Sequence, residues 1–311
     1  MYQLLEGLDG VEFIPIDKHA WDYVKFYRQM RQRSFDVLLA TQASWRANLL
    51  YPGIKAPIKI GFDRERWRDF QRLFVNRYLP PGRQHLLDIF LGFATALGAK
   101  ERVIEWRLPI TEVDQSFAAR QLGGGHDRWL AVNPTASKPQ RNWLAERYGA
   151  VINHAIETWG CRIVLTGGRA RSERQLGNAV LGYVRKTSAV LNLIGQTTPK
   201  QLAAVLGRAH ALLAPDTGPV HIATAMGTPV IGLYAVAPPE LSGPYLSQAL
   251  VVNRFPDAVR EMLGKDPATA PWGTRVHRGQ AMALIEVDAV LEKLDKVFSG
   301  QQAPTRSAAL S

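Results

Sequence analysis

Four residues in one short segment, Asp216, Thr217, Gly218 and His221, have the types and spacing to bind a phosphorylated ligand. The amides of Thr217 and Gly218 and the Thr217 hydroxyl suit phosphate oxygens, because they are hydrogen-bond donors without negative charge. Asp216 would repel phosphate, so we expect it to accept hydrogen bonds from sugar hydroxyls or from amides of its own turn. His221 could donate to a phosphate, orient Asp216, or be a structural histidine.

The residues around this segment predict a strand, a tight turn, a short helix and a second strand. Apolar residues fill 210–214 and 230–234, as in buried strands. Pro219 suits the first helical position, and Gly227 suits the residue after the helix. The helix would therefore begin at the carboxyl end of a parallel strand, where amides and the helix dipole favour phosphate.

Two more loops follow predicted strands. Thr135, Ser137 and Lys138 come after the strand predicted at 129–133 and precede a helix of about residues 142–158. Hydroxyls and one lysine at the carboxyl end of a strand could hold an anion, although turn-forming residues beside an exposed lysine give the same pattern.

The other loop contains Gly167 and Gly168, which follow the strand predicted at 162–166. Paired glycines let a ligand approach the backbone closely, but they are common after strands. Further on, Thr197 precedes Thr198, which we expect to cap a helix that starts near residue 200.

Basic residues are concentrated in the first third of the chain, including Lys59, Arg64, Arg66 and Arg68. Arg64, Arg68 and Arg72 are four residues apart, so they would share one face if the segment is helical. That face would be either solvated or a clamp for phosphates and sugar carboxylates, which the guanidinium group fits well. The formal net charge of +11 favours an anionic partner, and nucleic acid, an anionic membrane or a phosphorylated glycolipid would each qualify.

Composition excludes several classes of protein. The 311 residues, 46% of them hydrophobic, suffice for a sizeable core, but no apolar run is long enough to cross a bilayer. The first residues lack the pattern of a signal peptide, and Cys161, the one cysteine, is expected to be a small buried residue. We therefore expect a cytoplasmic protein. The sequence contains no D-x-D, H-E-x-x-H or C-x-x-C pattern, so we expect no metal.

The order of predicted elements indicates an α/β protein with doubly wound parallel sheets, because apolar strands alternate with amphipathic helices. The first half would contain strands at 11–16, 35–40 and 58–62 and helices at 21–33 and 85–97. We expect an N-terminal domain at 1–125 and a C-terminal domain at 126–298 that ends in a helix. A disordered tail would follow at 299–311, and a linker region is expected at about 108–128.

The pattern Asp-Thr-Gly-x-x-His at 216–221, followed by Ala-x-x-x-Gly-x-Pro at 223–229, resembles the donor-site motif of glycosyltransferase family 9. These are the ADP-heptose:lipopolysaccharide heptosyltransferases. The resemblance implies the GT-B architecture, in which two doubly wound Rossmann-like domains face a cleft. It further implies an inverting transfer of heptose from ADP-L-glycero-D-manno-heptose to the Kdo/heptose inner core of lipopolysaccharide, without a metal or other cofactor.

The resemblance also implies site residues. Donor-binding residues would be Thr135, Ser137, Lys138, Gly167, Gly168, Glu173, Thr197, Asp216, Thr217, Gly218 and His221. Among them, Lys138 would stabilise the leaving ADP, and Glu173 would be the carboxylate that binds the ribose. Acceptor-binding residues would be Lys59, Arg64, Arg66 and Arg68. The acceptor would be Kdo-bearing lipid A or a heptosylated core, met at the inner face of the inner membrane.

One feature departs from the family pattern. Family members carry an S-x-x-G-D loop near the start, whose aspartate would be the general base, and this sequence has no such segment. We therefore expect the N-terminal domain to be incomplete at its start, and the catalytic residue stays unknown. The alternatives are a GT-B enzyme that uses another nucleotide sugar and a catalytically inactive nucleotide-sugar-binding protein. A nucleic-acid-binding protein is disfavoured, because no basic motif interleaved with aromatic residues is evident.

Overall fold

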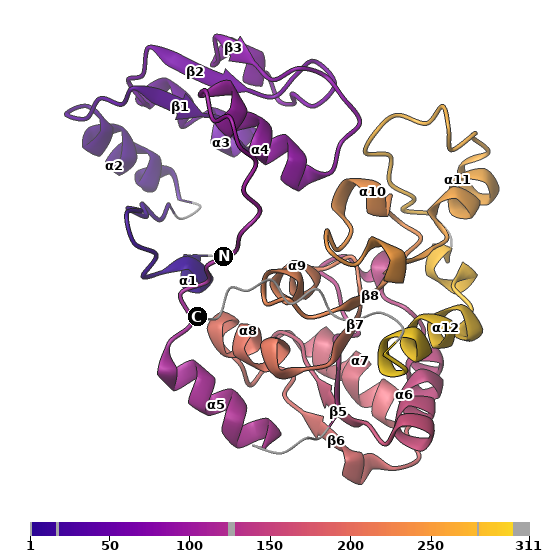
Figure 1. Ribbon diagram of the computed structural model, residues 1–311. Coiled ribbons are helices and arrows are strands. Elements are labelled where there is room, and N and C mark those ends of the chain that lie inside the picture. The colour runs from indigo at the N-terminus through magenta and orange to yellow at the C-terminus, as the bar shows by residue number, and fades with distance from the viewer. Residues whose placement is uncertain (1, 17–18, 124–127, 279, 301–311) are drawn as a thin grey trace. The chain divides into compact units, whose positions relative to one another are not determined.

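The computed structural model describes residues 2–16, 19–123, 128–278 and 280–300, and it divides the chain into two compact units. The N-terminal unit is residues 10–104, and the C-terminal unit is residues 1–9 together with 105–311. Each unit is built on its own parallel sheet, which confirms the predicted α/β class (Figure 1).

The C-terminal unit has a six-stranded sheet in the order β6-β5-β4-β7-β8-β9, with every strand parallel to its neighbours. The strands are β4 (Trp129–Val132), β5 (Arg162–Leu165), β6 (Val190–Asn192), β7 (Ala211–Pro215), β8 (Val230–Tyr234) and β9 (Val252–Asn253). Its helices are α1 (Tyr2–Leu5), α5 (Glu112–Leu122), α6 (Ala145–Trp159), α7 (Arg171–Leu181), α8 (Pro199–Arg208), α9 (Gly218–Ala225), α10 (Pro239–Ser242), α11 (Phe255–Leu263) and α12 (Val287–Phe298). Short 3₁₀ turns are η3 (Pro139–Arg141), η4 (Thr187–Ala189), η5 (Gln248–Leu250) and η6 (Ala281–Leu284).

Helices cover both faces of this sheet, which explains why its strands are almost continuously apolar. Successive residues of one strand point to opposite faces of the sheet, so that Leu130 and Ala131 of β4 belong to two separate cores. The first core packs against α6, α7, α11 and α12, and the second packs against α5, α8 and α9. The sheet is therefore doubly wound, as the sequence predicts, and its strand ends are fixed from both sides.

The N-terminal unit has a three-stranded parallel sheet in the order β1-β2-β3. The strands are β1 (Val37–Leu39), β2 (Ile58–Gly61) and β3 (Arg77–Tyr78). The helices are α2 (Ala20–Met30), α3 (Trp45–Asn48) and α4 (Leu86–Ala96), with the 3₁₀ turns η1 (Tyr51–Gly53) and η2 (Gln71–Leu73). Ile60 of β2 and Phe93 of α4 belong to one core of this unit.

Three local expectations are wrong. Residues 11–16 form no strand, and Val11 is 47% exposed, so this segment lacks the burial that a central strand would have. The predicted linker contains α5, whose first turn is closed by a capping box of Thr111 and Asp114, and which packs against α8. Because of this packing, the structural units do not divide at the predicted boundary between residues 125 and 126.

The third wrong expectation is the helical face of Arg64, Arg68 and Arg72. Residues 64–66 form a turn, and Asp69 and Phe70 have φ values of 53° and 65°, which interrupt any helix. The arginines therefore do not share a helical face. Residues 124–127 of the predicted linker and 301–311 of the predicted tail lie outside the described residues.

Cys161 offers a test of the packing. Its side chain is 2% exposed beside α6, and burial raises the pKa of the thiol to about 12. Since the reactive form is the thiolate, we expect iodoacetamide at pH 8 to leave the folded protein unmodified and to alkylate it rapidly in denaturant. The stabilisation that comes from burying the neutral thiol should be complete below about pH 8.5 and be lost as the pH rises towards 12. Equal labelling of folded and unfolded protein would contradict this packing.

Candidate active site

The carboxyl edge of the six-stranded sheet brings together most of the loops in which the sequence predicts ligand-binding residues. β4 lies between β5 and β7, and all three run parallel, so the loops that follow them leave from neighbouring points on one edge. This is the edge at which α/β sheets bind ligands.

Glu173 joins two of these loops. Its Oε2 atom accepts one hydrogen bond from the Thr135 hydroxyl at 2.8 Å and another from the Gly168 amide at 2.6 Å. Thr135 itself is 4% exposed, and the Gly195 amide donates to the Gly167 carbonyl at 3.0 Å. The loops after β4, β5 and β6 are therefore tied together, and Glu173 holds the positions of groups that could contact a ligand.

The loop after β7 opens α9 at this edge. Thr217 is the N-cap, with φ −152° and ψ 164°, and its side chain makes no capping hydrogen bond. Gly218, the first helical residue, is exposed, and a Cβ atom built on it would meet no atom within 4 Å. The first amides of a helix have no partner within the helix, so this N-terminus suits an anion. His221 lies exposed in the first turn of α9.

Asp216 is paired with Arg141, a residue that the sequence analysis missed. Arg141 lies in η3, and its Nη1 atom is 3.1 Å from Asp216 Oδ2 and 3.2 Å from the Asp216 carbonyl oxygen, to which it donates. Asp216 is 7% exposed, so the guanidinium compensates a nearly buried carboxylate. The pair links the loop after β4 to the start of α9. The available signal in the sequence was a second cation, Arg141, three residues after Lys138.

The remaining predicted residues are less enclosed. Ser137 and Lys138 are exposed, and Lys138 is the N-cap of η3. The loop before them is held by Asn142, whose Oδ1 atom accepts a 2.8 Å hydrogen bond from the Ala136 amide. Thr197 is half-buried and precedes Thr198, the N-cap of α8. These residues lie on segments that leave the same edge, although the structure assigns them no shared contact.

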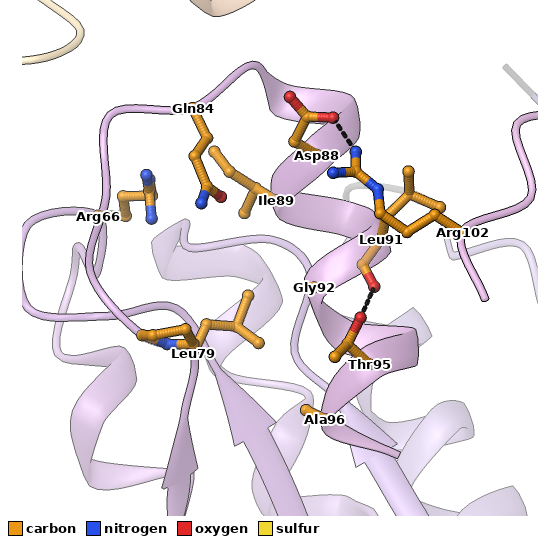
Figure 2. A pocket seen from close by; sticks show the side chains of 11 residues that line it. Arg66, Leu79, Gln84, Asp88, Ile89, Leu91, Gly92, Thr95, Ala96 and Arg102 are labelled. Carbon is orange, nitrogen blue, oxygen red and sulfur yellow. Dashed lines mark hydrogen bonds and ion pairs between the residues drawn. The ribbon is translucent and has the colours of Figure 1, made fainter. Parts of the chain in front are cut away.

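In the N-terminal unit, one of the predicted basic residues lines a cavity of about 340 Å³ (Figure 2). Arg66 pairs with Asp63, which is 2% exposed, through Nη1. Its Nε and Nη2 atoms are buried and have no hydrogen-bond partner among the described residues. Figure 2 shows the guanidinium on the side of the cavity where Gln84 also lies, with Arg102 paired to Asp88 across the cavity.

The other three basic residues are placed differently. Arg64 and Arg68 are exposed, and Lys59 of β2 directs its Nζ atom to the Tyr51 carbonyl oxygen at 3.5 Å. None of these three lines the cavity that Arg66 lines.

Over the described ranges, no three His, Cys, Asp or Glu side chains are close enough together to hold a metal ion. No helix of the described part combines the length and the apolar character needed to cross a bilayer.

A family model, a curated relative and two solved structures resemble this chain. The family model of glycosyltransferase family 9 (heptosyltransferase) matches residues 23–261. A lipopolysaccharide core heptosyltransferase, OpsX, of Haemophilus influenzae is 34% identical over 94% of this chain and 84% of its own length. A family 9 glycosyltransferase structure from Veillonella parvula aligns with a TM-score of 0.75 at 19% identity, over 96% of this chain and 85% of that one. The Escherichia coli heptosyltransferase WaaC, solved with ADP, gives 0.64 at 19% identity, over 89% and 77%.

Proposed function

The chain belongs to glycosyltransferase family 9, the heptosyltransferases, and we propose that it transfers heptose from ADP-L-glycero-D-manno-heptose to the inner core of lipopolysaccharide with inversion. The observation that carries the donor assignment is the open N-terminus of α9 at the carboxyl edge of the sheet. The related Escherichia coli heptosyltransferase WaaC has been solved with ADP and also with ADP-2-deoxy-2-fluoro heptose.

In this proposal the amides of Thr217 and Gly218 bind the pyrophosphate, and Lys138 neutralises the charge that develops on the leaving ADP. Glu173 holds the loops after β4 and β5 together through the bonds of its Oε2 atom to Thr135 and Gly168. Its second carboxylate oxygen, Oε1, is the acceptor that we propose for a ribose hydroxyl. Arg141 prevents Asp216 from repelling the phosphates, so that its carboxylate can accept hydrogen bonds from the sugar.

A turnover assay tests the activity. We expect release of ADP when ADP-L-glycero-D-manno-heptose and Kdo-lipid A are both present, and no comparable turnover with UDP- or GDP-sugars. Because we also propose that no metal takes part, EDTA should leave the rate unchanged. A clear preference for UDP would favour another nucleotide sugar, and tight ADP binding without turnover would favour an inactive nucleotide-sugar-binding protein.

For the acceptor we propose the cavity that Arg66 lines. Its two free donors suit a carboxylate or phosphate, which the Kdo-bearing acceptor carries. Replacing Arg66 with methionine should raise the acceptor KM about 10-fold, the effect of losing one charge-assisted hydrogen bond. The donor KM should not change.

Arg28→Met is the matched control, since Arg28 is exposed on α2 of the same unit and should be neutral. Because Arg66→Met also leaves Asp63 without its partner, the melting temperature is measured alongside, and Arg66→Lys keeps the charge. An unchanged acceptor KM in a folded Arg66→Met protein would remove Arg66 from the acceptor site.

We further propose that the protein works in the cytoplasm, in peripheral contact with the inner face of the inner membrane. The acceptor is a glycolipid and the chain carries a net charge of +11, which favours attraction to anionic lipids.

A further inference from the structure

Among the large apolar side chains of the N-terminal unit that are more than half exposed, three come from two adjoining segments. Trp45, the first residue of α3, is 54% exposed, Phe70 is 64% exposed, and Leu73 at the end of η2 is 67% exposed. The Trp45 amide donates to Asp69 Oδ2 at 2.8 Å, which places the start of α3 beside Phe70. We refer to Trp45, Phe70 and Leu73 as the apolar surface.

The backbone that presents this surface is held in an unfavourable conformation. Asp69 and Phe70 are the two non-glycine residues of the described part with positive φ, and a bulky aromatic residue is rare there. The Asn48 side chain, fully buried, donates to the Arg68 and Asp69 carbonyl oxygens at 3.0 and 2.7 Å. Such strain persists where surrounding contacts over-determine the backbone, and it is concentrated at functional segments.

A second buried amide anchors the far side of the loop. Gln71 is fully buried, and its Nε2 atom donates to the Ala40 carbonyl oxygen at 2.9 Å. The side-chain amides of Asn48 and Gln71 therefore fix a loop that directs the Phe70 side chain into solvent and not into the core. Core packing does not account for this arrangement, whereas a partner that covers Phe70 would.

The segments that carry the apolar surface are rich in positive charge. Residues 45–46 and 64–77 hold five exposed basic residues, Arg46, Arg64, Arg68, Arg72 and Arg77, against two exposed acidic residues, Glu65 and Asp69. Asp69 is already engaged by the Trp45 amide. Exposed aromatic and aliphatic side chains in segments rich in arginine match the boundary between lipid headgroups and acyl chains of an anionic bilayer.

We propose that the apolar surface docks the protein on an anionic lipid bilayer, with Trp45, Phe70 and Leu73 entering the headgroup boundary and the arginines contacting lipid phosphates. The inference rests on the proposed function to the extent that the acceptor is a membrane glycolipid. It names the surface by which the enzyme reaches that acceptor.

Sedimentation with vesicles tests this inference. We expect the protein to bind vesicles of phosphatidylethanolamine with 30% phosphatidylglycerol, and to bind phosphatidylcholine vesicles at least 10-fold more weakly. The triple variant Trp45→Ser, Phe70→Gly, Leu73→Ser should lose at least 10-fold in partitioning onto the anionic vesicles. Phe70→Gly places glycine at a positive φ, so this substitution by itself should maintain or raise the melting temperature.

The matched control is Trp21→Ser, Val103→Ser, Val113→Ser, which removes three residues that are 70%, 64% and 70% exposed elsewhere. This control should bind vesicles like the unaltered protein. Equal vesicle binding by the two triple variants, or no preference of the unaltered protein for anionic lipid, would overturn the docking surface.

Activity on a water-soluble acceptor with its acyl chains removed separates the two proposals. The triple variant Trp45→Ser, Phe70→Gly, Leu73→Ser should retain full turnover on the soluble acceptor and lose turnover only on acceptor embedded in vesicles. If the unaltered protein turns over the soluble acceptor but does not bind vesicles, the docking surface alone is overturned. If the unaltered protein binds vesicles but turns over neither acceptor, the proposed function is overturned. Equal loss on both acceptors would mean that the surface acts in the reaction itself and would also overturn docking.

Discussion

Replacing Gly218 with valine should weaken the binding of ADP about 100-fold. The expected loss corresponds to two amide hydrogen bonds to a charged phosphate at about 1.5 kcal/mol each. A Cβ atom at Gly218 would meet no protein atom within 4 Å, and its φ lies outside the left-handed region. The added side chain should therefore be harmless to the fold and should occupy only the space in front of the helix N-terminus, where the pyrophosphate is proposed to bind. Isothermal titration of ADP measures the effect.

The design separates steric exclusion from unfolding. Gly218→Ala should give a smaller loss than Gly218→Val, and both should melt at the temperature of the unaltered protein. Gly182→Ala at the end of α7 is the control, because Gly182 is also exposed with negative φ and lies at the opposite end of its helix from the site. A Cβ atom there would lie 3.3 Å from the Ala179 carbonyl oxygen, so the melting temperature of this variant is measured as well. An unchanged dissociation constant for ADP in Gly218→Val would remove α9 from the donor site.

The C-terminal sheet is predictable from sequence because its strands are buried on both faces and so are apolar throughout. For β4 and β8, turns and helix caps then give the ends to within a residue or two. The carboxyl-edge loops follow from the same reasoning, since parallel strands place all their carboxyl ends at one edge. Local chemistry also explains Thr198, whose hydroxyl accepts from the Gln201 amide in a capping box.

Interactions between loops distant in sequence are not predictable in this way. Thr135 and Glu173 are 38 residues apart, and nothing in either segment indicates that they bond. The turn at residues 64–70 is also hidden, because basic residues four apart fit a helix equally well. What determines that turn is the buried Asn48, roughly 20 residues earlier in the chain. Sequence alone therefore identifies the loops of the site, whereas the hydrogen bonds that hold these loops together are seen only in the structure.

Replacing Arg141 with methionine should lower the free energy of unfolding by about 3 kcal/mol, because it leaves a nearly buried carboxylate at Asp216 without its counter-charge. It should also lower kcat/KM about 100-fold, since an uncompensated Asp216 would repel the diphosphate of the donor. Chemical denaturation and steady-state kinetics measure the two effects separately. The control for a loss of stability without a change at the site is Arg147→Met. This substitution removes another partly buried arginine of the same unit, which donates hydrogen bonds to the Ala283 and Ile285 carbonyl oxygens.

The double variant Arg141→Met, Asp216→Asn decides between a structural and a functional pair. Removing the negative charge as well should restore most of the stability, because no unpaired charge is then buried. Activity should stay low, since the amide is a weaker acceptor for the sugar hydroxyls that Asp216 is proposed to bind. If the double variant recovers both stability and kcat/KM, the pair serves only to connect the loop after β4 to α9. If the single variant loses stability but keeps kcat/KM, the charge of Asp216 lies away from the diphosphate, and the proposed donor geometry fails.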